Sequence, residues 1–180
     1  MKTPPHGQQP SLRGQAIKLL ARREHSRAEL AKKLSRKLAA QASAAAEADV
    51  ADEGSTRAAA QDNIDNVLDQ LEQSGLLSDA RAADAYVRSH AARFGTARLS
   101  HSLRTRGIDP ALIEASLAQE GIEGEMTRAA AVWRGKFSGK PHDAREWARQ
   151  ARFLQSRGFS TDIIRKLLKE MPEASEEHDE

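Results

Sequence analysis

The 180-residue sequence lacks cysteine altogether, which excludes disulfide bonds and thiolate metal sites. Only 4% of its residues are aromatic, and no run approaches the roughly 18 consecutive apolar residues that a membrane-spanning helix requires. No signal peptide is recognisable in the first residues. We therefore expect a cytoplasmic protein.

Catalytic signatures are also missing. The chain contains no Gly-rich phosphate-binding loop, no His-Glu-x-x-His motif and no nucleophile elbow. Its six His are scattered, and no two of them have the spacing of a metal-binding pair on one helix. Ser and Asp are plentiful, but they stand where helices are expected to begin, so helix capping is their simplest role. We expect neither an enzyme nor a bound cofactor or metal ion.

Large apolar residues are few, but they recur at helical spacing. Ala alone accounts for 32 residues, and Ile, Leu, Val and Phe together account for another 32. Leu30, Leu34 and Leu38 lie on one face of a predicted helix, and most other large apolar residues follow the same period. This pattern predicts an all-α protein with several thin cores. The aromatic side chains could in principle stack on nucleic-acid bases, but most of them fall on these apolar stripes, so core packing is favoured for Tyr86, Trp133, Phe137, Trp147 and Phe159. Phe153 follows Arg152 and lies beside its stripe, so both roles stay open for it.

A glycine joint recurs between predicted helices. Leu103 precedes Gly107 by four residues and Ile108 follows it, which is typical of a helix that ends in a Schellman motif with a left-handed Gly. Asp109 is then a suitable N-cap for the next helix, and Pro110 suits its first position. The same pattern surrounds Gly158, with Leu154, Phe159 and Ser160, and Gly75, with Leu71, Leu76 and Ser78 or Asp79.

The chain also repeats itself at a distance of 51 positions. Residues 97–117 aligned with 148–168 give seven identities in 21 positions, against roughly one expected from average composition. Most identities are joints and core positions, but the matched Arg residues have no evident structural reason. The pairs are Ala97/Ala148, Arg98/Arg149, Leu103/Leu154, Arg106/Arg157, Gly107/Gly158, Ile113/Ile164 and Leu117/Leu168.

These patterns predict nine helices in an elongated array of three tandem three-helix repeats. The Ala-rich segment 39–60 is expected to extend the second helix and then form a mobile loop before a helix at 61–74. N-caps are expected at Ser11, Ser26 and Thr96, and the first helix of the third repeat is expected to contain Phe137. The predicted parts are a disordered lead (1–10), repeat 1 (11–75, with the insert 39–60), repeat 2 (76–121), repeat 3 (122–170) and an acidic disordered tail (171–180).

Charge is strongly segregated along the chain. Residues 1–38 carry ten Lys and Arg against two acids, whereas residues 39–80 carry one against nine. Segregation of this kind favours an acidic or polyanionic partner, although solvated helix faces explain it equally well. Any one basic residue is best interpreted as a surface residue, but stacked repeats would present them as a series. The candidates are Arg22, Arg23, Lys32, Lys33, Arg36, Lys37, Arg98, Arg104, Arg106, Arg149, Arg152 and Arg157.

Several motifs, in the right order, resemble the RecX family of regulatory proteins. Residues 16–34 (AIKLLARREHSRAELAKKL) are similar to the opening of that family, and residues 75–81 (GLLSDAR) and 103–108 (LRTRGI) are similar to its second part. Residues 152–159 (RFLQSRGF) resemble its last repeat. The resemblance covers about residues 11–170. Ala82 departs from the Phe that is frequent there, which should thin the core of the second repeat.

The resemblance implies a non-enzymatic modulator of the RecA recombinase with three tandem three-helix repeats. Such a protein binds the RecA–DNA filament, mainly inhibits its recombinase, ATPase and coprotease activities, and thereby acts in recombination, DNA repair and the SOS response. We expect it to act as a monomer and to contact DNA weakly or as part of the filament. The alternative is a helical protein that binds nucleic acid directly and independently of RecA; an unrelated helical scaffold is a third possibility.

Overall fold

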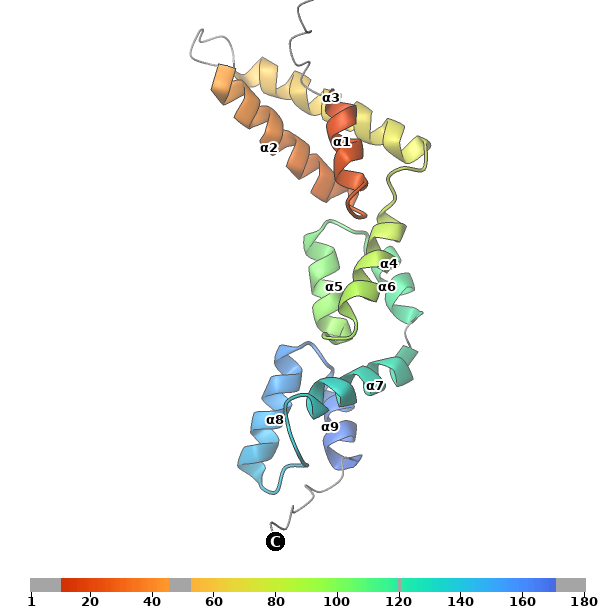
Figure 1. Ribbon diagram of the computed structural model, residues 1–180, viewed down its shortest axis with the longest axis vertical. Helices are drawn as coiled ribbons and strands as arrows, with labels where there is room; N and C mark the ends of the chain where they lie inside the picture. Colours follow the sequence, from red (N-terminus) through yellow and green to blue (C-terminus); the bar gives the residue numbers. More distant parts are fainter. Residues whose placement is uncertain (1–10, 46–52, 120, 171–180) are drawn as a thin grey trace, which may run out of the picture. The chain divides into compact units, whose positions relative to one another are not determined.

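The structure, a computed structural model, describes residues 11–45, 53–119 and 121–170 (Figure 1). Within these ranges the secondary structure is entirely helical, which confirms the all-α prediction. The predictions for the lead, the centre of the insert and the tail lie outside the described residues. The helices of the described ranges number nine: α1 (Leu12–Leu20), α2 (Arg27–Ala45), α3 (Glu53–Gln73), α4 (Asp79–His90), α5 (Thr96–Thr105), α6 (Pro110–Ala118), α7 (Gly121–Arg134), α8 (Ala144–Ser156) and α9 (Thr161–Glu170).

The described helices belong to two compact units. The first unit comprises α1 to α3, the start of α4 and residues 106–108. Helices α1, α2 and α3 pack against one another in all three pairings. Their apolar stripes meet in a core that contains the predicted Leu30 and Leu34, both fully buried. The other members of this core are Ala16, Ile64, Val67, Leu68, Leu71 and Leu77.

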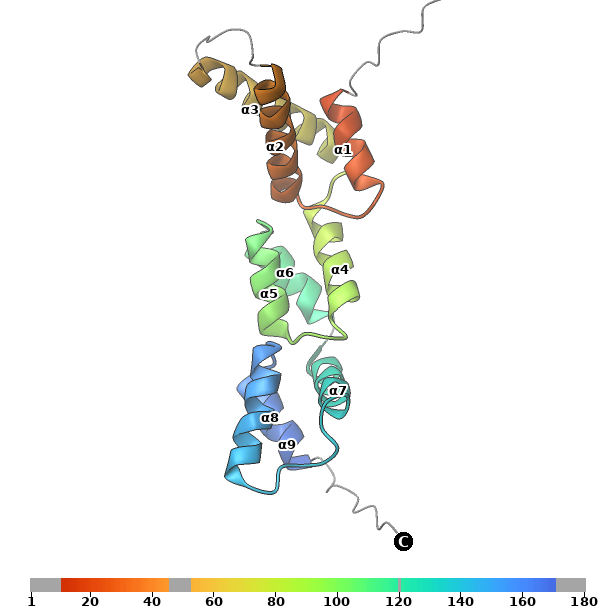
Figure 2. The ribbon, with the colours of Figure 1, turned by 60° about the vertical axis from the view of Figure 1, so that its left-hand side comes forward.

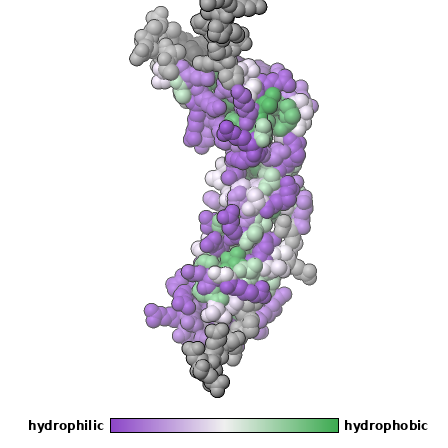
Figure 3. Space-filling view, in the orientation of Figure 1, coloured by the Kyte–Doolittle hydropathy of each residue, from purple (hydrophilic) through white to green (hydrophobic). Residues whose placement is uncertain are grey.

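The second unit comprises the rest of α4 and helices α5 to α9. Helix α5 packs on α6, and α7, α8 and α9 form a three-helix group (Figure 2). The core of this group contains Trp133 from α7, Leu154 from α8 and Phe159 from the joint before α9. Helix α9 adds four buried residues at helical spacing: Ile163, Ile164, Leu167 and Leu168. Hydrophilic side chains cover most of the face drawn in Figure 3, and apolar colour is confined to small patches.

Predicted helix starts are confirmed at several positions. The Ser11 hydroxyl accepts the N–H of Gly14 at 3.2 Å, and the Asp109 carboxylate accepts that of Ala111 at 2.8 Å. Ser26 and Glu29 form a complete capping box, in which each side chain accepts the backbone N–H of the other residue. The Ser26 hydroxyl accepts the N–H of Glu29 at 3.1 Å, and the Glu29 carboxylate accepts the N–H of Ser26 at 3.4 Å. Each cap satisfies backbone donors that the first helical turn leaves without partners.

Four local predictions are wrong. Helix α5 already includes Thr96, because the carbonyl of Gly95 accepts the N–H of Leu99 and thereby takes the cap position. Helix α7 ends at Arg134, before Gly135, so Phe137 lies in the following connection. Helix α3 begins at Glu53 instead of near 61, because the Ala-rich stretch before the apolar stripe continues its helix. Trp147, expected in the core, is 42% exposed.

Two of the three glycine joints lie inside a three-helix group, and the third does not. All three glycines have positive φ, as predicted: +70° at Gly75, +73° at Gly107 and +86° at Gly158. Gly107 connects α5 to α6 and Gly158 connects α8 to α9, whereas Gly75 connects α3 to α4. A Cβ at Gly107 would lie 2.5 Å from Ala28 Cβ, but one at Gly75 would meet nothing within 4 Å. A Cβ at Gly158 would likewise overlap Arg98 Cβ, so Gly107 and Gly158, but not Gly75, lie against the first turn of another helix.

Candidate functional site

The first unit carries a basic surface on α2 and the turn before it. Lys32 and Arg36 are one helical turn apart, as are Lys33 and Lys37, so these side chains lie in adjacent rows. We call Arg22, Lys32, Lys33, Arg36 and Lys37 the α2 basic surface; all but the half-buried Lys33 are exposed.

Cations are crowded on the α2 basic surface. Burial lowers the pKa of Lys33 below its usual range, and the neighbouring Arg23, Arg22 and Lys37 lower it further, against an opposing contribution from Glu29. A group whose protonated form is disfavoured by other cations gains from an approaching anion. Arg27, by contrast, is already neutralised, because it forms ion pairs with Asp69 at 2.8 Å and Glu72 at 2.7 Å on α3.

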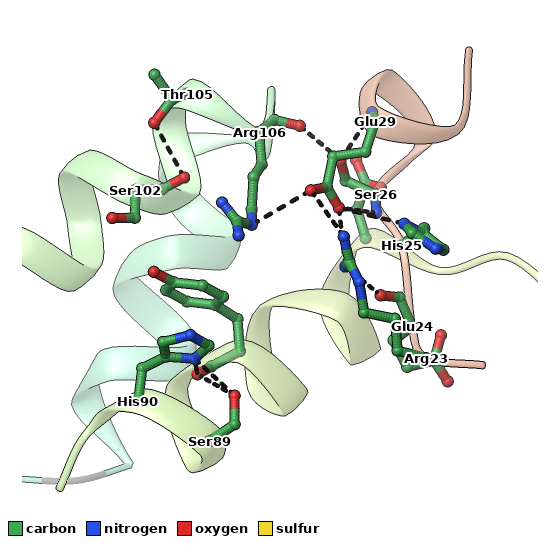
Figure 4. Close-up of polar contacts among 12 residues, drawn as sticks. Arg23, Glu24, His25, Ser26, Glu29, Ser89, His90, Ser102, Thr105 and Arg106 are labelled. Carbon is green, nitrogen blue, oxygen red and sulfur yellow. Dashed lines mark hydrogen bonds and ion pairs between the residues drawn. The ribbon is translucent and has the colours of Figure 1, made fainter. Parts of the chain in front are cut away.

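A second cluster surrounds the Glu29 carboxylate (Figure 4). The Arg23 guanidinium donates to both carboxylate oxygens at 3.3 Å, and Arg106 Nε lies 3.4 Å from Oε1. The Ser26 hydroxyl donates to the Arg106 carbonyl at 2.5 Å. Two of the predicted binding residues, Arg23 and Arg106, thus hold the connection 106–108 against the start of α2. Glu29 therefore has two roles: it completes the capping box with Ser26, and it pairs with Arg23 and Arg106.

His25 completes the Glu29 cluster from a buried position. Its side chain is 2% exposed, and its Nδ1 lies 3.6 Å from Glu29 Oε2, beyond hydrogen-bond length. Burial, assisted by the Arg23 and Lys33 cations, lowers the pKa of His25 below 6.5 despite the nearby carboxylate. Burial alone would raise the pKa of Glu29, but its hydrogen bonds and charge pairing with Arg23, together with the Arg106 charge, lower it below 4.5.

Acidification should therefore weaken the first unit in two steps. The unfolded chain protonates His25 first, so stability from the neutral ring is complete above pH 6.5 and is lost as the pH falls through the lowered folded pKa. Stability from the Glu29 carboxylate is present above pH 4.5 and is lost as the pH falls through its own lowered pKa. Urea unfolding followed by circular dichroism, from pH 7.5 to a pH below the lowered pKa of Glu29, measures both steps. His25→Gln should remove the first step; parallel profiles for wild type and variant would contradict this assignment.

The second unit places three of the predicted Arg residues on aromatic rings. The guanidinium carbon of Arg98 lies 4.3 Å from the centre of the Phe94 ring, and that of Arg149 lies 5.8 Å from the centre of Phe137. Arg157 lies 5.3 Å from the Phe153 ring and 6.0 Å from Phe94. Attraction between a cation and a ring face holds these side chains flat. Arg104 and Arg152 are exposed on α5 and α8.

The Arg106/Arg157 pair of the 51-residue repeat stands at a backbone contact that occurs twice in the structure. The Arg106 carbonyl accepts from Ser26 before α2, and the Arg157 carbonyl accepts the N–H of Gly95 before α5 at 2.9 Å. In both cases the Arg-Gly joint is bonded to the connection that precedes the second helix of a three-helix group. The joint is thus repeated as a backbone packing contact; because the carbonyl of any residue could make it, the contact does not explain why Arg occupies both positions.

Sequence reasoning missed Phe94 and His90. Phe94 lies in the connection between α4 and α5, where helical periodicity carries no information. His90 ends α4 and stacks on Tyr86 with ring centres 4.0 Å apart. The only signal in the sequence was the run Tyr86, His90, Phe94, in which aromatic residues recur every four positions.

Two further kinds of feature are absent from the residues that the structure describes. No group of three or more His, Asp or Glu side chains among them is arranged to hold a metal ion. None of their helices combines the length and apolar character needed to cross a membrane.

Comparison with known proteins gives matches along most of the chain. Residues 78–117 match the second three-helix domain of RecX, and residues 123–168 match the third. The regulatory protein RecX of Leptothrix cholodnii is 43% identical over 169 residues, which cover 94% of this chain and 92% of that protein. RecX of Herminiimonas arsenicoxydans is 38% identical over 164 residues, covering 89% of this chain and 93% of the relative.

The crystal structure of RecX from Lactobacillus salivarius has the same fold, with a TM-score of 0.66 and 22% identity over 88% of this chain and 93% of that one. The fold and the matched domains define a protein built from tandem three-helix domains, as predicted. The chain belongs to the RecX family.

Proposed function

We propose that this protein binds the RecA–DNA filament and mainly inhibits the recombinase, ATPase and coprotease activities of RecA. It would thereby act in recombination, DNA repair and the SOS response, as a monomer and without chemistry of its own. Membership of a family of proteins named for regulation supports the role. The observation that carries the binding site is the α2 basic surface, where burial, and after it the crowding of neighbouring cations, lowers the pKa of Lys33.

Inhibition by contact requires only that the protein bind one state of the filament more tightly than another. A filament that contains DNA presents phosphate charge, and a cluster of cations with few acidic neighbours is attracted to it. On α2 the acidic Glu29 is committed elsewhere, to Arg23 and Arg106. Glu29 therefore does not neutralise the α2 basic surface, whose positive charge can attract an acidic partner.

The test measures ATP hydrolysis by RecA on single-stranded DNA while this protein is titrated in. Wild-type protein should lower the rate. The variant Lys33→Glu/Arg36→Glu/Lys37→Glu should require at least about tenfold more protein for the same inhibition, because each reversal replaces an attraction by a repulsion. Circular dichroism verifies that the variant keeps its helices.

A matched control reverses three exposed Arg residues outside the α2 basic surface: Arg13, Arg134 and Arg145. The net charge of this control changes by the same amount. If the control inhibits nearly as well as wild type, the weaker inhibition by the α2 variant is due to the place of the reversed charges and not to the total charge. An unchanged ATPase rate with wild-type protein would refute the proposed function. Equal inhibition by the triple Glu variant and wild type would refute the α2 assignment alone.

A further inference from the structure

One side-chain system of the second unit is not used by the proposed RecA contact. Aromatic rings and guanidinium groups form a connected series across α4, the connection after it, α5, α8 and the connections on both sides of α8. We call it the ring–guanidinium surface: Tyr86, His90, Phe94, Arg98, Arg157, Phe153, Phe137 and Arg149.

The contacts are continuous from one end to the other. The His90 ring is stacked between Tyr86, at 4.0 Å, and Phe94, at 6.5 Å. Arg157 then bridges the Phe94 and Phe153 rings, and Phe153 meets the edge of Phe137 at 5.3 Å. Every contact that links the series is a ring on a ring or a cation on a ring.

This series lies at the surface and not in the core. Its five rings are half-buried, whereas the core of this unit uses the fully buried Trp133 and Phe159. Arg98 and Arg149 are exposed, so the outward faces and edges of their guanidinium groups are accessible. Arg98 donates one hydrogen bond to the Ser156 carbonyl at 2.9 Å, and this bond helps to hold the guanidinium group beside the Phe94 ring.

The ring–guanidinium surface ends in an open pocket of about 610 Å³ between α8 and the connection before it. Four groups that can bind an anion line this pocket: Lys136, Lys140, His142 and Arg149. Phe137 and Phe153 supply its apolar side. The acidic Glu146 is engaged, since its carboxylate accepts the N–H of His142 at 3.1 Å and lies 3.4 Å from Arg149.

We infer that the ring–guanidinium surface binds single-stranded nucleic acid, with unpaired bases against the rings and guanidinium planes and a phosphate in the pocket. Aromatic and Arg side chains along a basic path are the combination that binds unpaired bases regardless of sequence. A duplex keeps its bases stacked inside and cannot use the rings. An acidic peptide would use the cations alone and would leave five half-exposed rings without a role.

The test uses the full chain without RecA, so that its failure is separate from failure of the proposed function. Fluorescence anisotropy measures binding of a labelled 20-mer of oligo(dT) and of a mixed-sequence duplex of equal length, both at low salt. Wild-type protein should bind the single strand at least about tenfold more tightly than the duplex. Phe94→Leu and, separately, Arg149→Gln should each weaken oligo(dT) binding by roughly tenfold. Phe94→Leu should leave duplex binding unchanged.

Arg145→Gln is the matched control, since Arg145 is exposed on α8 but does not belong to the ring–guanidinium surface. It should bind oligo(dT) nearly as wild type does. The inference is overturned if wild-type protein does not bind oligo(dT), if it binds the duplex equally well, or if Arg149→Gln binds like Arg145→Gln. Displacement of oligo(dT) by a Glu-rich decapeptide at equal concentration would also overturn it, in favour of an acidic protein partner.

Discussion

Replacing Gly158 by Ala is expected to lower the unfolding free energy of the second unit by about 2–5 kcal/mol. The first part of the loss comes from the backbone, because φ at this position is +86° and an L-residue with a Cβ strains there. The second part comes from contact. A Cβ at Gly158 would overlap the Arg98 Cβ and would lie 2.5 Å from the Arg98 backbone nitrogen.

The strained position cannot relax, because Gly158 is bonded to the connection before α5. The Gly158 carbonyl accepts the N–H of Ala97 at 3.1 Å, and the N–H of Gly95 is bonded to the Arg157 carbonyl at 2.9 Å. Gly95 itself has no room, since a Cβ there would overlap the Gly158 carbonyl oxygen. A shift of either backbone would break the hydrogen bonds that join the two connections.

Both Trp residues of the chain, Trp133 and Trp147, belong to the second unit, so intrinsic fluorescence during urea unfolding reports its stability. Gly121→Ala is the control in the same unit. Gly121 has φ of +63°, but nothing lies within 4 Å of the position that a Cβ would occupy. Its loss should therefore be limited to the backbone part, about 1–2 kcal/mol. Equal losses for the two variants would show that the contact with Arg98 is unimportant.

Replacing Gln150 by Ala should cost about 2–4 kcal/mol in the same measurement. Gln150 is 2% exposed in a helix that is otherwise strongly charged. Its Oε1 accepts the Trp133 indole N–H at 2.7 Å, and its Nε2 donates to the Gly139 carbonyl at 3.1 Å. Truncation leaves both partners buried without a hydrogen bond, and each such group costs about 1–3 kcal/mol.

Gln155→Ala is the matched control, because Gln155 lies exposed on the same helix and its loss should stay within about 0.5 kcal/mol. The Gln150 variant should also shift Trp133 emission in the folded state, since the indole N–H loses its partner. A Gln150→Ala protein as stable as Gln155→Ala would mean that water replaces both hydrogen bonds.

Local features of the fold could be predicted because they depend on residues a few positions apart. The Ser26–Glu29 capping box and the left-handed Gly158 follow from contacts within one helical turn. The wrong assignments concern mainly helix ends. Thr96 was predicted as a cap from its residue type, but the position is taken by Gly95, whose lack of a side chain is required by a distant joint.

The sequence indicated which basic residues are candidates for binding, but it did not indicate how their side chains are arranged. The series of basic residues was visible, but nothing nearby in the sequence indicated that Arg106 pairs with Glu29 or that Arg98 lies on Phe94. Phe94 was not predicted as a candidate, because it lies in a connection, where residues do not recur at helical spacing. The lowered pKa of His25 likewise requires burial, first of all, and the Arg23 and Lys33 cations.

By itself the sequence determined the all-helical class, the repeat of 51 positions and the family, since these rest on periodicity, caps and motif order. Tertiary structure alone decided which Arg residues lie on rings, which are paired with carboxylates and which glycines admit no side chain. The physical reason is distance along the chain. Helix signals act within about one turn, whereas Gly95 with Gly158 and Glu29 with Arg106 meet only because helices have packed.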